Sequence, residues 1–78
     1  MKNKTLHYNI VLRPEPEGGF TVTVPALPGC ITYGSSLEEA KDMASDAIQA
    51  YLASVSKHKG DVVSDNNSFI TTLDIAYA

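Results

Sequence analysis

The residues of this chain best suited to chemistry are its carboxylates, because several carboxylates that converge can hold two divalent ions about 4 Å apart and hydrolyse a phosphodiester. The candidates for such a site are Glu38, Asp42, Asp46 and Asp74, four of the nine acids. The three apolar segments at 6–13, 20–24 and 30–33 contain no acid at all. We therefore expect no metal-binding cluster and interpret the acids at four-residue spacing as one polar surface.

Cys30 is the only thiol and could act as a nucleophile with His7 or His58 as its base. It directly follows the turn residues Pro28 and Gly29 and begins an apolar segment, so we expect a buried small hydrophobic residue instead. Two histidines without nearby thiols or paired acids make no zinc site, and the chain has no glycine-rich phosphate loop. The sequence therefore predicts no enzyme, no cofactor and no small-molecule ligand.

Length and composition predict one small domain, residues 1–78, since 78 residues with 44% apolar side chains supply a single core. Domains of this size often gain stability by association, so a homo-oligomer is expected. One unpaired cysteine favours a reducing compartment, the cytoplasm, and no apolar run approaches the roughly 20 residues of a membrane span.

The charge is uneven along the chain. The net charge is −3, and residues 14–56 carry six acids against the single base Lys41. A net-acidic domain repels phosphate and lacks the electrostatic attraction on which most nucleic-acid binders depend. We expect a basic protein partner and no direct DNA binding.

The elements that must position these residues begin with three predicted strands. Residues 6–13 and 20–24 alternate apolar and polar side chains, and residues 30–33 are apolar and β-branched. Prolines and glycines at 14–19 and 25–29 force the chain to turn between them. The pattern predicts an antiparallel meander.

A helix and a further strand follow. Ser36 can accept a hydrogen bond from the amide of Glu39 while the Glu39 side chain returns to the Ser36 amide, a capping box. Apolar residues then recur every three or four positions until basic residues and Gly60 end the helix. Residues 69–77 alternate again and predict a fourth strand. Connectivity places it beside the first, in the order 3-2-1-4, so the fold class is α+β with one helix on one face.

Two joined motifs resemble the HicB-type antitoxin domain: GFTVTVPALPGC at residues 19–30 and GSSLEEA at residues 34–40. The resemblance implies a partial ribonuclease H-like fold, β-β-β-α-β. It also implies an interaction protein that binds and neutralises a small basic HicA-type toxin, which cleaves messenger RNA. Many members of that family add a C-terminal DNA-binding domain, which we do not expect after the last predicted strand.

Three functions remain open. The first is the antitoxin, with the partner-binding candidates Tyr33, Glu38 and Asp42. The second is a stand-alone homo-oligomeric binding module of the same fold that has no toxin. The third, ranked last, is a metal-dependent nuclease that depends on Asp74.

Overall fold

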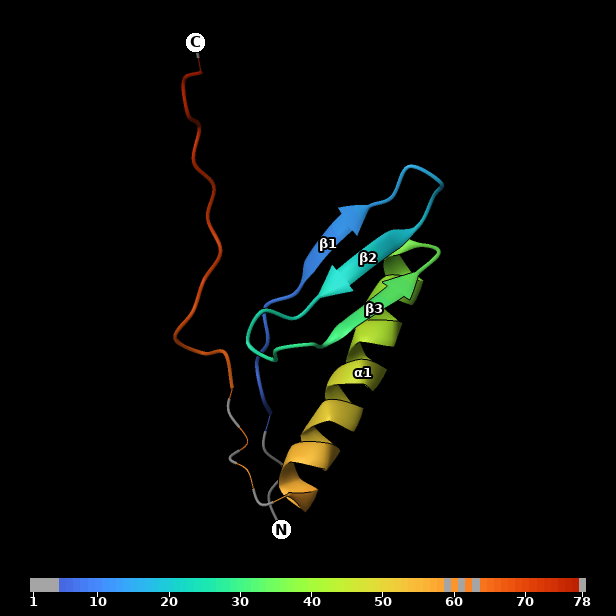
Figure 1. Cartoon of the computed structure of the whole chain (residues 1–78), viewed down its shortest axis with the longest axis vertical. Helices are drawn as coiled ribbons and strands as arrows, with labels where there is room; N and C mark the ends of the chain where they lie inside the picture. Colours follow the sequence, from blue (N-terminus) through green and yellow to red (C-terminus); the bar gives the residue numbers. More distant parts are fainter. Residues whose placement is uncertain (1–4, 59, 61, 63, 78) are drawn as a thin grey trace.

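The computed structural model describes residues 5–58, 60, 62 and 64–77 and consists of a three-stranded sheet with one long helix lying along one face (Figure 1). The elements are β1 (Val11–Pro14), β2 (Phe20–Thr23), β3 (Ile31–Gly34) and α1 (Leu37–Lys57). Both strand pairs are antiparallel and the order is β1-β2-β3. The α+β class and the meander predicted from sequence are confirmed; β1 and β2 are shorter than their predicted segments, and β3 is shifted by one residue.

The first turn shows why two consecutive glycines separate β1 from β2. Gly18 and Gly19 both have positive φ, 106° and 80°, a region that side chains with a Cβ rarely adopt. The Gly18 amide donates to the Glu15 carbonyl at 2.9 Å, and the Glu15 amide donates to the Gly19 carbonyl at 3.0 Å. The turn therefore closes on itself and sets Pro14 opposite Phe20.

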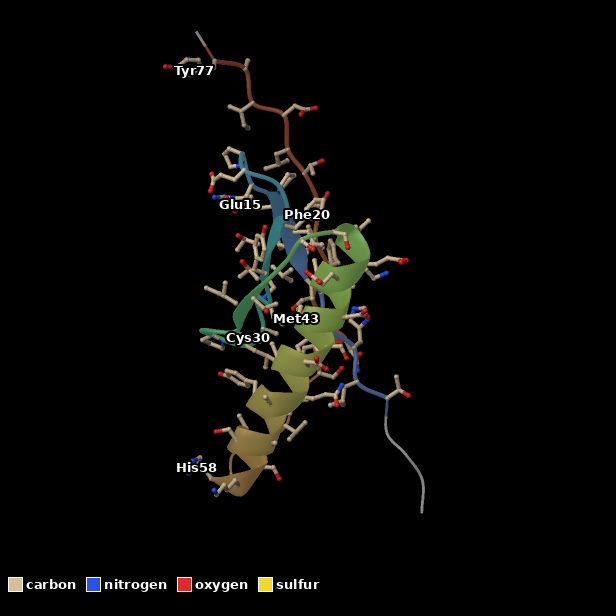
Figure 2. The ribbon with its side chains drawn as sticks, turned by 90° about the vertical axis from the view of Figure 1, so that its right-hand side faces the viewer. Glu15, Phe20, Cys30, Met43, His58 and Tyr77 are labelled. Atoms are coloured by element: carbon tan, nitrogen blue, oxygen red, sulfur yellow. The ribbon has the colours of Figure 1, made fainter. Side chains whose placement is uncertain are left out.

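The core lies between the sheet and α1 and consists of two clusters. In the first, Val22 at the centre of the sheet packs with Ala40 and Ala44 of the helix, and all three are buried. The second joins Val24, Leu27 and Cys30 at the turn between β2 and β3, as Figure 2 shows for Cys30 beside the helix. Alanines on the buried side of α1 allow the helix to approach the sheet closely.

Gly34 is required by this close approach. It ends β3, is buried, and faces the first turn of α1. A Cβ at Gly34 would overlap the backbone nitrogen and Cα of Ala40 and lie 2.8 Å from the carbonyl carbon of Glu39. Because all three atoms belong to the backbone, no side chain can move aside to make room.

The ends of α1 follow the sequence signals with one correction. Ser36 caps the helix and accepts the Glu39 amide at 3.1 Å, as predicted. The Glu39 carboxylate, however, accepts from the amide and the hydroxyl of Ser35, at 2.6 and 2.8 Å, and not from Ser36. These hydrogen bonds hold the pKa of Glu39 below its usual value. At the other end, the Gly60 amide donates to the Val55 carbonyl at 2.8 Å.

The predicted fourth strand is not formed, and the order 3-2-1-4 is not confirmed. Residues 69–77 are extended but pair with no strand in the described part of the chain, and they lie apart from the sheet (Figure 1). The hydrogen bonds that hold this part of the chain to residues 7–9 end at Ser68, whose carbonyl accepts from Asn9 Nδ2 at 3.0 Å; the same Nδ2 donates to the Asp65 carboxylate at 3.1 Å. These contacts hold a turn from which the chain leaves the edge of β1.

Candidate functional site

The predicted acidic candidates lie on the outer surface of α1. Glu38 and Asp42 are both exposed, are one helical turn apart, and line a hollow of about 250 Å³ together with Lys41. Glu38 also lies in the first turn, where the positive end of the helix dipole favours a carboxylate. Two acids around one lysine leave this surface net negative, which suits contact with a basic protein.

The third candidate, Tyr33, lies on the other face of the sheet. In the register, Tyr33 is opposite Thr21, while its neighbour Gly34 faces α1, and successive residues of a strand point to opposite faces. The structure therefore does not bring Tyr33 together with the two helix acids. Its hydroxyl donates to the Gly18 carbonyl at 2.9 Å, so the side chain also fastens the first turn.

The sheet face opposite α1 carries two rows of side chains across the three strands. One row is Arg13, Thr21 and Tyr33, and the other is Val11, Thr23 and Ile31. Val11 and Thr23 are exposed on this face, whereas Thr21 is only half-exposed and donates from its hydroxyl to the Glu15 carboxylate at 2.6 Å. Ile31 was not singled out by the sequence reasoning. It is two positions from Tyr33 on the same strand, so both side chains lie on this face, and it is 62% exposed.

The groups considered for catalysis do not converge. Cys30 is buried, as predicted, and burial raises the pKa of its thiol, so the nucleophilic thiolate is disfavoured. Asp74 lies on the exposed segment 69–77, while Asp46 lies on α1. Within the residues that the structure describes, no three His, Cys, Asp or Glu side chains are grouped so that they could hold a metal ion.

The two histidines have separate surroundings. The His7 backbone amide donates to the Ser64 hydroxyl at 2.7 Å, and its carbonyl accepts the Asp65 amide at 2.6 Å. His58 caps the C-terminal end of α1, and its amide donates to the Ser54 carbonyl. Both histidines are exposed, whereas Cys30 is buried.

Comparison with known proteins decides the family. Residues 8–74 match the family model described as the HicB-like antitoxin of bacterial toxin–antitoxin systems. The chain belongs to the HicB-like antitoxin family. A UPF0150 protein of Thermoplasma acidophilum is 38% identical over 66 residues, which is 85% of this chain and 96% of that protein. A UPF0150 protein of Helicobacter pylori is 37% identical over 62 residues, 80% of this chain and 86% of that protein.

Relatives that are named as antitoxins are longer. Antitoxin HicB 1 of Photorhabdus laumondii is 42% identical over 45 residues, which is 58% of this chain and 29% of that protein. Antitoxin HicB of Escherichia coli K12 is 37% identical over 43 residues, 55% of this chain and 31% of that protein. This HicB-like chain therefore spans about a third of those two relatives.

Membership in an antitoxin family favours a non-enzymatic role for this HicB-like chain. In the described part of the chain, α1 does not combine the length and apolar character that crossing a bilayer requires.

Proposed function

We propose that this chain is the antitoxin of a toxin–antitoxin pair, and that it binds and neutralises a small basic HicA-type toxin that cleaves messenger RNA. The family match over residues 8–74 carries the proposal. The net charge of −3 supports it, because a protein that binds RNA phosphates must present a positive surface. Since such a toxin acts on messenger RNA, the proposal also places this chain in the cytoplasm.

We assign the toxin-facing charge to the outer surface of α1. Glu38 and Asp42 are exposed and adjacent there, and the hydrogen bonds described for α1 leave both carboxylates outside the capping contacts of Ser35 and Ser36. Carboxylates placed against a basic RNA-binding surface occupy positions that substrate phosphates would take. Such complementarity speeds association and fixes orientation more than it adds affinity.

Tyr33 is proposed as a separate contact on the opposite side of the sheet. It is 50% exposed on β3, an edge strand that pairs only with β2 among the residues that the structure describes, so its ring offers apolar area to a partner. Because it does not share a surface with Glu38 and Asp42, its contribution must be measured independently of theirs.

The test is binding of a purified basic HicA-type toxin to charge-reversal variants. Glu38→Lys with Asp42→Lys should weaken binding by at least about tenfold, and more strongly at low salt, where charges are less screened. Glu17→Lys with Asp74→Lys is the matched control, since it reverses two exposed charges of the same sign that lie outside α1. Equal affinity of both double variants would contradict the assignment to α1.

A second comparison tests Tyr33. Tyr33→Phe removes only the hydroxyl that bonds to Gly18, whereas Tyr33→Ala also removes the exposed ring. If the ring contacts the toxin, only the alanine variant loses affinity. If both variants bind as the wild type does, Tyr33 serves the turn alone.

A further inference from the structure

The C-terminal segment, residues 69–77, exposes an apolar series with no cover. Phe69, Leu73, Ile75 and Tyr77 are 84%, 83%, 78% and 98% exposed. They occupy alternate positions, with Thr71 as the exception on that side, and the intervening positions are Ile70, Thr72, Asp74 and Ala76. Such alternation predicts a strand with one mainly apolar side and one mixed side. Exposed apolar series of this extent are uncommon on monomeric proteins and mark interaction sites.

The same molecule has an apolar groove that such a strand would fill. The groove has a volume of about 420 Å³ and lies between residues 6–10 and α1. Its apolar lining is provided by Leu6, Tyr8, Ile10, Ala44, Ile48 and Leu52. It exists because α1 packs against β2 and β3 and leaves the β1 side of the sheet uncovered.

The outer edge of β1 lies beside this groove and has no partner strand in the described chain. β1 pairs with β2 on one side only. A strand added to its free edge gains main-chain hydrogen bonds. Alternate side chains of that strand would enter the groove, and the intervening ones would join the face that carries Thr21 and Thr23. Alternation in residues 69–77 would direct Phe69, Leu73, Ile75 and Tyr77 into the groove, and Thr72 and Asp74 toward the face that carries Thr21 and Thr23.

The contacts before the segment fix its starting point beside residues 7–9, and beyond them it runs apart from its own sheet (Figure 1). Asp65 is buried, its amide donates to the His7 carbonyl, and its carboxylate accepts from the Asn9 amide at 3.3 Å and from Asn9 Nδ2 at 3.1 Å. Asn9 Nδ2 also fixes the Ser68 carbonyl. From this turn the segment extends beyond the hairpin that carries Glu15, where Tyr77 lies at the far end of the molecule (Figure 2).

We propose that residues 69–77 pair with the free edge of β1 in a second copy of this chain, and that the two copies exchange these segments reciprocally. The turn at Asp65–Ser68 stays clamped to residues 7–9 of its own copy, and the apolar side of each segment fills the groove of the other. Two copies that exchange their segments reciprocally are related by a two-fold axis. Both grooves are then filled, so the assembly is a dimer and does not grow further. The proposal does not depend on the presence of a toxin.

The first experiment compares two charged substitutions within the segment by sedimentation. Leu73→Asp places a carboxylate on the apolar side and should raise the dimer dissociation constant by at least about 100-fold, because a charge buried without a partner is costly. Thr72→Asp is the matched control on the polar side and should leave the dimer intact. A wild-type chain that sediments as a monomer overturns the proposal, as does equal dimerisation of both variants.

The second experiment distinguishes exchange from closure onto the same chain. Chains without ¹⁵N carry a spin label at Asp74→Cys in a Cys30→Ser background. They are refolded together with ¹⁵N chains that carry no spin label. Exchange predicts broadened amide signals at Val11, Leu12 and Arg13 of the ¹⁵N chains. In the reverse sample, the ¹⁵N chains carry the spin label themselves and are mixed with an excess of chains that have neither ¹⁵N nor a spin label. Only a contact within one chain broadens β1 signals in that sample. Broadening at β1 in the reverse sample alone, or in neither, overturns the proposal; unchanged circular dichroism shows that the variants fold.

Discussion

Replacing Gly34 by alanine tests the packing of α1 on the sheet most severely. The added Cβ would overlap the backbone nitrogen and Cα of Ala40 and lie 2.8 Å from the Glu39 carbonyl carbon. Overpacking a core costs about 1–3 kcal/mol, and we expect the upper end because only a shift of the helix itself can relieve the contact. In a domain of this size, about 3 kcal/mol corresponds to a fall in melting temperature of roughly 12–24 °C.

Gly29→Ala is the matched control for this prediction. Gly29 has φ of 82° and nothing within 4 Å of an added Cβ, so its substitution adds backbone strain without a clash. That strain costs about 1–2 kcal/mol. Urea and thermal unfolding, followed by circular dichroism, measure both variants against the wild type. If Gly34→Ala is no less stable than Gly29→Ala, the described approach of α1 to β3 is wrong.

Three further predictions concern single side chains. Ser36→Ala removes the acceptor of the Glu39 amide and should lower the free energy of unfolding by about 1 kcal/mol in urea titrations; an unchanged midpoint would dismiss the cap. Hydrogen bonds from Ser68 and Asn9 hold the pKa of Asp65 below its usual value. Its contribution to stability is therefore present above about pH 4 and is lost as the pH falls through the folded-state pKa. Asp65→Asn should be less stable than the wild type at pH 7, with a gap that narrows on acidification; a gap independent of pH would contradict this. Finally, burial raises the pKa of Cys30, so a thiol reagent at pH 7 should react far more slowly with the folded chain than with the chain in urea, and equal rates would show that the thiol is accessible.

Local patterns predicted most of the fold because their causes are local. Alternation at 20–24 placed Val22 and Val24 in the core, and the positive φ of Gly18 and Gly19 follows from the turn that they form. The Ser36 cap is set by residues three positions apart. The preference of the Glu39 carboxylate for Ser35 was missed, because it depends on the direction in which the chain enters the helix.

The fourth strand was mispredicted for a different reason. Alternation in residues 69–77 reports the character of a strand but not the edge that it pairs with. The contacts of Asn9 with Asp65 and Ser68 join residues 56 and 59 positions apart. No periodicity in the sequence signals such a contact, although it fixes the point from which residues 69–77 begin.

In the candidate site too, some features follow from the local sequence and others only from the tertiary structure. Ile31 and Tyr33 are two positions apart on β3 and lie on one face of the sheet, a pairing that the sequence reasoning did not draw. Whether that face also receives Glu38 and Asp42 depends on the side of the sheet that α1 covers, which only the tertiary structure decides. The three candidates therefore separate into two surfaces.

Inhibition of a toxin's ribonuclease activity tests the central claim most directly. A purified small basic HicA-type toxin encoded beside this chain's gene is assayed on RNA while the full chain is added in increasing amounts. The account predicts that cleavage falls in proportion to the added chain and stops near stoichiometric addition. Undiminished cleavage in the presence of excess folded chain would contradict the antitoxin assignment.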